Sequence, residues 1–377
     1  MRIGFDGKRA VQNFTGLGNY SRYVADILCH FYPENDYILY APKKRENKRM
    51  NLLTGQYRQL TLAYPATSFW KKLSSLWRVW GITSQLEKEG IELFHGLSNE
   101  LPLNIHKSRI KSIVTIHDLI FLRYPQYYQS IDRKIYTYKF RKACENADKI
   151  IAISECTKRD ITRYFNIPDD KIDVVYQGCD VSFTHPVTEE KKEEVRKKYQ
   201  LPDHYILNVG SIEERKNILA AVQALPMLPH HIHIVIVGRR TGYTKKVEQF
   251  IKDNGLGERV HIISNVPFND LPAFYQSAEI FVYPSRFEGF GIPIIEALYS
   301  GIPVVAATGS CLEEAGGPDS IYVNPDDITG LADAFKQIYS NSDKRKNMVE
   351  KGREFAKRFS EKQQSEEIIN IYKKLIR

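Results

Sequence analysis

Residues 279–306 read EIFVYPSRFEGFGIPIIEALYSGIPVVA, and this stretch decides the fold. Residues 279–285 are rich in β-branched and aromatic side chains, which favour a strand, and residues 302–306 form a second such run. Pro293 suits the first turn of a helix and Gly301 suits its C-terminal stop, so we expect a short helix between them. Strand, loop, helix and strand in this order form one βαβ unit of a parallel sheet.

The same alternation of strand-like runs and helix-length amphipathic stretches extends along the chain. It predicts repeated βαβ units. In the first half the expected strands are residues 3–5, 37–40, 93–94, 113–116, 150–153 and 174–176. In the second half they are residues 205–210, 232–237, 260–263, 280–283 and 303–306.

The chain has 377 residues, more than the roughly 250 to 300 that one hydrophobic core organises. The strand pattern restarts after the charged segment TEEKKEEVRKK at 188–198, which we expect to be helical. The sequence therefore predicts an α/β protein with two Rossmann-like, doubly wound domains that face each other across a cleft. Their expected bounds are 1–183 and 184–358, and residues 359–377 are expected to form a helix that returns to the first domain.

The loop before the helix at 293–301 has the composition of a binding site. Gly289 and Gly291 let a ligand approach the backbone, and the N–H groups at the helix start attract phosphate. Glu288 precedes the loop and Glu296 lies one turn into the helix, so both carboxylates can accept hydrogen bonds from sugar or ribose hydroxyls. An isolated Glu-Gly pair would indicate only a surface glutamate, but here it stands between two predicted strands.

The spacing of Glu288 and Glu296 resembles the E-x7-E motif of the retaining glycosyltransferases of family 4, which have the GT-B fold. The resemblance implies that Glu288 binds hydroxyls of the donor sugar and that Glu296 binds the ribose. It also implies that the N–H groups of Gly289, Phe290 and Gly291 bind the sugar and the phosphates. The likeness spans nearly the whole chain and is strongest over residues 205–316.

A pair of cations follows another predicted strand, which ends at Gly210. Arg215 and Lys216 precede a helix, and together they could stabilise the negative charge of a departing diphosphate. The segment resembles the diphosphate-binding run E-P-R-K-N of the same family, although Glu214 stands where that run has proline. Two cations at the start of a helix are also common on solvated surfaces.

Three further positions match the family's donor site. His117 follows the expected strand 113–116, where the family has a histidine near the reacting carbon, although an isolated histidine is more often structural. Gly16 and Gly18 are expected in a glycine loop after the first strand, and a tight turn is the alternative explanation. Val266 is expected near the pocket for the nucleotide base.

The chain carries a net charge of +9, all of it in the first half: residues 1–180 contain 28 Lys and Arg against 19 Asp and Glu, a difference of +9. This asymmetry favours an anionic partner, such as a diphosphate-linked acceptor or a lipid surface, and solvated charge explains it equally well. We also expect residues 69–80 to form one amphipathic helix that packs on its domain or contacts the acceptor, with membrane binding as the alternative; its apolar face comprises Phe69, Trp70, Leu73, Leu76, Trp77 and Trp80.

The expected reaction is transfer of a hexose, with retention, from a nucleotide diphosphate sugar to a hydroxyl of a glycan or lipid-linked acceptor. GDP-mannose is favoured as the donor, and surface polysaccharide synthesis is the expected context. The second domain would hold the donor and the first the acceptor, with no cofactor and no metal. The alternatives are a nucleotide-sugar epimerase of similar architecture, a transferase-like subunit that only binds, and a nucleic-acid binder, for which there is no motif.

The location of the protein is predicted from what its sequence lacks. No segment approaches the roughly 20 apolar residues of a membrane span, and the N-terminus begins directly with a strand-like run. The five cysteines are scattered and include no C-x-x-C pair, as is usual for thiols in a reducing compartment. We therefore expect a cytoplasmic protein, with peripheral association at the inner face of the membrane as an open alternative.

Overall fold

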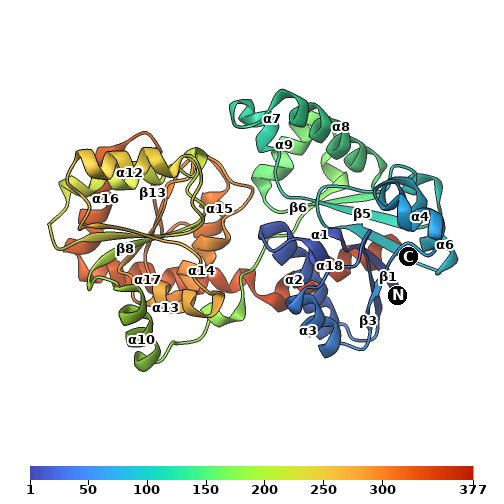
Figure 1. Ribbon diagram of the computed structural model, residues 1–377, viewed down its shortest axis with the longest axis horizontal. Coiled ribbons are helices and arrows are strands. Elements are labelled where there is room, and N and C mark those ends of the chain that lie inside the picture. The colour runs from blue at the N-terminus through green and yellow to red at the C-terminus, as the bar shows by residue number, and fades with distance from the viewer. Residues whose placement is uncertain (377) are drawn as a thin grey trace. The chain divides into compact units, whose positions relative to one another are not determined.

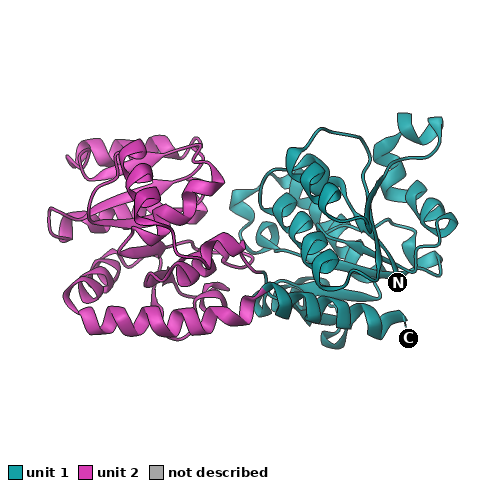
Figure 2. Ribbon diagram, turned by 90° about the horizontal axis from the view of Figure 1, so that it is seen from below, with its two compact units in different colours: residues 1–177, 361–377 teal, residues 178–360 magenta. Residues whose placement is uncertain are grey.

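The structure is a computed structural model that describes residues 1–376. The chain divides into two compact units (Figures 1 and 2). Unit 1 contains residues 1–177 and the C-terminal helix α18 (Glu361–Ile376), and unit 2 contains residues 178–360. These limits differ by a few residues from the sequence-based ones at 183 and 358.

Unit 1 is built on a seven-stranded parallel sheet with the strand order β3-β2-β1-β4-β5-β6-β7. The strands are β1 (Arg2–Asp6), β2 (Asp36–Tyr40), β3 (Leu60–Ala63), β4 (Leu93–Gly96), β5 (Lys111–Ile116), β6 (Lys149–Ala152) and β7 (Ile172–Val174). The order reverses at β1, so the chain's first strand lies inside the sheet, as in doubly wound folds.

Helices cover both faces of this sheet, because neighbouring residues of a strand point to opposite sides. Ile113 belongs to the core that includes α2 and α18, whereas Val114 belongs to the core on the other face. The helices of the unit, besides α18, are α1 (Lys8–Gln12), α2 (Gly16–Phe31), α3 (Lys48–Gln56), α4 (Ser68–Lys72), α5 (Ser74–Leu76), α6 (Ile82–Lys88), α7 (Ile120–Arg123), α8 (Ser130–Asn146) and α9 (Glu155–Phe165).

Helix α18 packs beside α2 and completes one of the two cores of unit 1 (Figure 1). Its Tyr372 is fully buried, and the Tyr372 hydroxyl lies 2.6 Å from Nδ1 of His95 in β4. The other ring nitrogen of His95 lies 2.8 Å from the hydroxyl of Thr115 in β5. Burial lowers the pKa of His95 to about 3, so this histidine is neutral and serves as a hydrogen-bonding link between the helix and the sheet.

The prediction of one amphipathic helix over residues 69–80 is wrong. Helix α4 ends at Lys72, a short helical turn α5 follows, and residues 77–81 form a π-helical turn, η1 (Trp77–Gly81). Because the helical repeat changes, the aromatic residues no longer share one face: Trp77 is fully buried, whereas Phe69 and Trp80 are exposed. This segment packs on its unit through Trp70 and Trp77.

Unit 2 is built on a six-stranded parallel sheet with the order β10-β9-β8-β11-β12-β13. The strands are β8 (Tyr205–Val209), β9 (His233–Val237), β10 (Val260–Ile263), β11 (Ile280–Tyr283), β12 (Val304–Ala307) and β13 (Ile321–Val323). The helices are α10 (Glu189–Tyr199), α11 (Ile218–Ala224), α12 (Thr244–Asp253), α13 (Leu271–Gln276), α14 (Ile292–Ser300), α15 (Leu312–Gly316), α16 (Ile328–Ser340) and α17 (Ser342–Ala356). One hydrophobic core joins α11, α12 and α16 to the sheet.

The stretch that decides the fold forms β11, a loop, α14 and β12, as predicted. Pro293 stands in the first turn of α14, where its missing N–H leaves no hydrogen bond unmade. Gly301 ends the helix with φ of +75°, a left-handed conformation that glycine adopts without strain. The charged segment at 188–198 is helical as predicted, and the Thr188 side chain caps α10.

Candidate functional site

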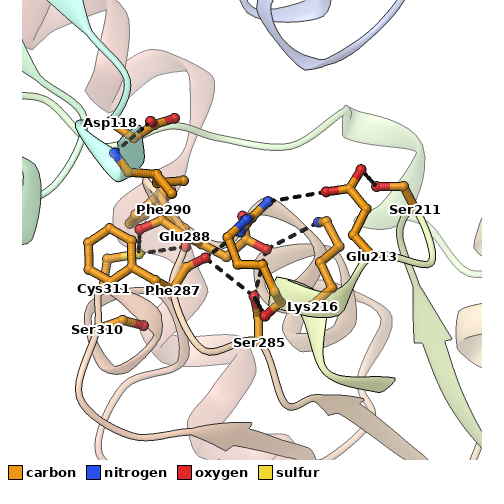
Figure 3. Close-up of polar contacts among 12 residues, drawn as sticks. Asp118, Ser211, Glu213, Lys216, Ser285, Phe287, Glu288, Phe290, Ser310 and Cys311 are labelled. Atoms are coloured by element: carbon orange, nitrogen blue, oxygen red, sulfur yellow. Dashed lines mark hydrogen bonds and ion pairs between the residues drawn. The ribbon is translucent and has the colours of Figure 1, made fainter. Parts of the chain in front are cut away.

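A buried cluster of charges lies at the carboxyl edge of the sheet in unit 2 (Figure 3). Glu288 comes from the loop after β11, and its carboxylate forms ion pairs with Arg215 at 2.9 Å and with Lys216 at 3.1 Å. The same carboxylate accepts hydrogen bonds from the hydroxyls of Ser285 at 2.8 Å and Tyr283 at 3.2 Å. The structure thus brings together three of the four residues for which a catalytic role is predicted.

The charges in this cluster stabilise one another. Burial alone would raise the pKa of Glu288, but the cations Lys216 and Arg215 outweigh it and lower the pKa to about 2. In the same way Glu288 raises the pKa of Lys216 against the effect of burial. The side chains of Arg215, Lys216 and Glu288 are 14%, 17% and 13% exposed. Two cations and one anion are therefore largely shielded from solvent at the carboxyl edge of the sheet. Their sum is one positive charge.

The backbone around Gly210 explains how the two cations are presented. Strand β8 ends at Val209, and a single 3-10 turn, η6 (Glu214–Lys216), carries both of them. A Cβ atom at Gly210 would lie 3.3 Å from the ammonium of Lys216, which in turn lies 5.3 Å from the centre of the Tyr283 ring. The absence of a side chain at Gly210 therefore leaves room for the buried lysine beside the aromatic ring.

Glu296 lies in α14 and has a different environment from Glu288. Its carboxylate accepts a hydrogen bond of 2.6 Å from the hydroxyl of Tyr275 in α13. Burial raises the pKa of Glu296 to about 7, although the Tyr275 hydrogen bond opposes the shift; the negative charge of Asp180 raises it further. No hydrogen bond or ion pair within residues 1–376 links Glu296 to Glu288. The two glutamates thus carry different charges near neutral pH.

Cys311 contacts the backbone of the loop formed by Gly289, Phe290 and Gly291. The Cys311 sulfur lies 3.0 Å from the carbonyl oxygen of Glu288 and 2.8 Å from that of Phe290, so its one S–H is shared between the two acceptors. In a trans peptide the N–H points opposite to the C=O, so the N–H groups of Gly289 and Gly291 point away from Cys311. Gly291 immediately precedes α14, and its carbonyl accepts from the N–H groups of Ile294 and Ile295, so among the described residues the N–H groups of Gly291 and Ile292 are the ones left for a ligand at the helix start.

Four residues of this site are marked by no sequence motif: Cys311, Tyr275, Tyr283 and Ser285. All five cysteines are buried thiols, and their scattered spacing gave no sign that one of them holds a loop. Tyr275 and Cys311 come from other elements of the fold, and only the tertiary structure places them beside the motif. Val266 is half-buried in the loop after β10 and takes no part in the charge cluster.

The remaining predicted residues belong to unit 1. His117 follows β5 and is 6% exposed; its Nε2 lies 2.9 Å from the Leu97 carbonyl, and its Nδ1 lies 3.3 Å from the Gln177 amide. The carbonyl can only accept, so Nε2 carries the proton and Nδ1 accepts. Burial lowers the pKa of His117 to about 4, which keeps it neutral and unsuited to act as a proton donor near pH 7.

The two glycines of the first unit occupy the start of a helix, not a loop before it. Helix α2 begins at Gly16, and the short helix α1 lies between it and β1. A Cβ atom at Gly18 would lie 2.0 Å from the Asn13 carbonyl oxygen, so only glycine fits there. At Gly16 no atom lies within 4 Å of such a Cβ. The prediction of a glycine loop is therefore corrected to a close helix–turn contact at Gly18.

Two absences within residues 1–376 complete the description. No group of three or more His, Cys, Asp or Glu side chains is placed to hold a metal ion. No helix in the same range combines the length and apolar character needed to span a bilayer.

Comparison with known proteins agrees with this architecture. The model of glycosyl transferases group 1 matches residues 189–355, and that of glycosyltransferase family 4 matches residues 21–183. O-antigen chain mannosyltransferase B of Escherichia coli is 30% identical over 75% of this chain and 74% of its own length. O-antigen chain mannosyltransferase RfbU of Salmonella typhimurium is 29% identical over 60% of each chain, so the match spans less than two thirds of that relative.

Solved structures show the same fold. HepE of Anabaena, crystallised with UDP, aligns over 100% of both chains with a TM-score of 0.78 at 18% identity. A glycosyltransferase of Rickettsia africae aligns over 100% of this chain and 98% of its own, with a TM-score of 0.79 at 20% identity. Together with the two family models and the mannosyltransferase relatives, these likenesses establish that the chain belongs to the group 1 glycosyltransferases and has the GT-B fold.

Proposed function

We propose that this glycosyltransferase moves a mannose residue from GDP-mannose to a hydroxyl of a glycan or lipid-linked acceptor, with retention at the anomeric carbon, in the synthesis of a surface polysaccharide. The observation that carries the proposal is the buried cluster of Arg215, Lys216 and Glu288 in unit 2. Two O-antigen mannosyltransferases among the relatives support the choice of mannose.

The donor's diphosphate would bind to the two cations of the cluster. Arg215 and Lys216 exceed Glu288 by one positive charge, and two anionic phosphates would reverse that imbalance. As the bond to the sugar breaks, negative charge grows on the leaving diphosphate, and cations already fixed in place stabilise it without reorganisation. Glu288 holds both cations and also presents an ionised carboxylate to hydroxyls of the sugar.

The nucleoside would be held by α14. The N–H groups of Gly291 and Ile292 at the helix start, together with the glycine loop before them, would donate to phosphate oxygens. Glu296, one turn further along the helix, would accept hydrogen bonds from the ribose hydroxyls once it is ionised, and Val266 would lie near the base. Binding of the two hydroxyls favours the ionised form, so donor binding is expected to lower the pKa of Glu296.

Unit 1 would bind the acceptor. His117 is neutral, its Nε2 donates to Leu97 and its Nδ1 accepts from Gln177, so it would contact the transferred sugar only by exchanging the longer Gln177 contact, and we assign it no proton transfer. Among the described residues no side chain of the cluster in unit 2 is a plausible covalent nucleophile, because Glu288 is held by two cations. We therefore infer a front-face displacement in which the leaving diphosphate takes the acceptor's proton. No metal or cofactor is needed in this scheme, and the protein would work in the cytoplasm, at the inner face of the membrane if the acceptor is a lipid.

The proposal is tested by incubating the protein with a panel of GDP- and UDP-sugars, with and without EDTA, and measuring released GDP and UDP. Release of GDP from GDP-mannose, unaffected by EDTA, is the expected result. NMR of the product should show the α-anomer that the donor carries. Turnover of UDP-sugars alone would refute the donor, and loss of activity in EDTA would refute the metal-free scheme.

A further inference from the structure

Two cations at the carboxyl edge of the sheet in unit 1 have no ion pair of their own within residues 1–376. Lys8 and Arg9 begin α1 directly after β1, and both are half-buried. Within residues 1–376 no hydrogen bond or ion pair joins the Lys8 ammonium or the Arg9 guanidinium to another group. Burial and the nearby charge of Arg78 lower the pKa of Lys8, and the charges of Glu100 and Asp6 offset this only in part. The ammonium has therefore lost hydration without gaining a hydrogen-bonding partner.

The carboxylates nearest to these cations are already occupied. Arg78 of η1 forms ion pairs with both Asp6, at the end of β1, and Glu100; the second is 2.5 Å long. Arg78 is 12% exposed, and Asp6 and Glu100 are 5% and 19% exposed, so this is a largely buried network. Lys139 also forms an ion pair of 3.7 Å with Glu100. Four cations, Lys8, Arg9, Arg78 and Lys139, thus face two carboxylates, which leaves two positive charges in excess.

A second group of cations lies at the same edge, in residues 41–49, which follow β2, include the first two residues of α3 and are called the β2 loop below. This β2 loop contains five Lys and Arg and one Glu, a difference of +4. Arg45 donates to the carbonyl of Gln12 at 3.1 Å, and the Gln12 amide donates to the Lys43 carbonyl at 3.3 Å. The β2 loop therefore lies against the end of α1, and much of the excess charge of the first half is concentrated around this edge.

The edge also contains the residue of unit 1 with an expected role in the reaction. β5 runs parallel to β1 within one sheet, so His117 follows the same edge as Lys8 and Arg9. Besides burial, the charge of Arg9 contributes to the low pKa of His117, which places the guanidinium within electrostatic reach of the ring. The donor's diphosphate already has cations in unit 2, so these cations are left to serve a different anion.

We propose that Lys8 and Arg9 bind a phosphate group carried by the acceptor. The positive charges of the β2 loop would attract that phosphate electrostatically from a longer distance. This inference rests on the proposed function, because it names the chemical class of the acceptor. Arginine offers paired N–H groups that match phosphate oxygens, and lysine adds a compact point charge. A phosphate held there would replace the hydration that the two cations lack.

The first test is direct binding, which does not depend on catalysis. With the donor site saturated by GDP, inorganic pyrophosphate is titrated calorimetrically into the full chain, into the Lys8→Ala/Arg9→Ala variant and into the Lys107→Ala/Arg109→Ala variant. The last pair is exposed, lies on the loop before β5 and changes the net charge equally. We expect a pyrophosphate site in the wild type and in the Lys107/Arg109 control, and a Kd weakened about 100-fold, roughly tenfold for each cation, in the Lys8/Arg9 variant. No pyrophosphate site beside GDP, or equal weakening in both variants, would overturn the proposal.

The second test assigns the phosphate to its source. Two acceptors are compared by kcat/KM: a mannose linked through a diphosphate to a short alkyl chain, and the matching alkyl mannoside. The ratio of the first value to the second should fall about 100-fold in the Lys8/Arg9 variant. It should be largely retained in Lys8→Arg, which keeps both positive charges. An unchanged ratio, with loss of binding to vesicles of phosphatidylglycerol, would assign the site to lipid headgroups and refute the acceptor role. Failure of the proposed function is separate, since it would appear as no release of GDP from GDP-mannose by the wild type.

Discussion

Replacing Glu288 by Gln removes one negative charge from the cluster with Arg215 and Lys216, while the side chain keeps its size. Three effects are expected, and they do not all have the same sign. Stability should fall, because the two buried cations lose their counter-charge. Binding of GDP should tighten, up to about tenfold, because Arg215 and Lys216 no longer share their hydrogen bonds with a carboxylate. Transfer should nevertheless drop at least about 100-fold, since the ionised acceptor for the sugar hydroxyls is gone.

The size of the stability loss follows from the pKa of Glu288. It falls from 4.5 to about 2 on folding, and each pH unit corresponds to about 1.4 kcal/mol, so the ionised carboxylate contributes about 3 kcal/mol near pH 7. Because the folded pKa is the lower one, this contribution is complete above pH 5 and is lost as the pH falls toward 2. The difference between wild type and variant should therefore shrink from about 3 kcal/mol at pH 6 to about 2 kcal/mol at pH 3.5.

Urea unfolding at several pH values, GDP titration calorimetry and donor turnover measure the three effects. Glu213→Gln is the matched control: Glu213 also faces Arg215, but at 3.7 Å and with its side chain 36% exposed, so each effect should be small. Weaker GDP binding in Glu288→Gln, or a stability difference that does not change with pH, would refute the account of the cluster.

Three further predictions concern Glu296 and Cys311 in unit 2 and Gly18 in unit 1. Glu296→Gln should stabilise the protein at pH 8 but not at pH 4. The folded-state pKa of Glu296 is raised to about 7, so the ionised wild-type carboxylate lowers the stability as the pH rises from 4.5 through 7. Urea unfolding at both pH values checks this, and equal stabilisation at both would contradict it. Cys311→Ala should raise the donor KM several-fold by releasing the loop carbonyls, and Cys311→Ser should restore it, whereas equal KM values would show that the thiol does not hold the loop. Gly18→Ala should destabilise by about 2 kcal/mol or more, because its Cβ would clash with Asn13, whereas Gly16→Ala should be near neutral; equal midpoints in thermal unfolding would refute the contact.

The central strands were predictable from sequence, and the strands that were missed lie at sheet edges. β3 and β13 are each the outermost strand of a sheet, and β13 has only half-buried residues. A strand with a neighbour on one side only needs fewer apolar residues, so its sequence resembles that of a loop. The helix expected over residues 69–80 failed for a related reason: spacing alone does not reveal where the helical repeat changes, as it does between Leu73 and Trp77.

The candidate site shows the same division between local and distant information. Glu288, Gly291 and Glu296 were found because one loop and one helix present them in sequence order. Tyr275 and Cys311 act on the same residues from α13 and from the start of α15, and neither lies in a motif. The different protonation of the two glutamates also depends on these tertiary neighbours, so no pattern of residues could have predicted it.

The contact between His95 and Tyr372 has a consequence for how the protein is made. These partners are 277 residues apart, so at 5 to 20 residues per second the ribosome adds Tyr372 roughly 15 to 55 s after His95. The strands of unit 1 are all made only once synthesis has passed β7 at Val174, and from then until α18 is added the sheet lacks the helix that covers part of one face. Unit 2 can fold from a continuous segment before unit 1 is sealed, although its sequence comes second. The nascent chain therefore leaves the α18 site uncovered while unit 2 is being made.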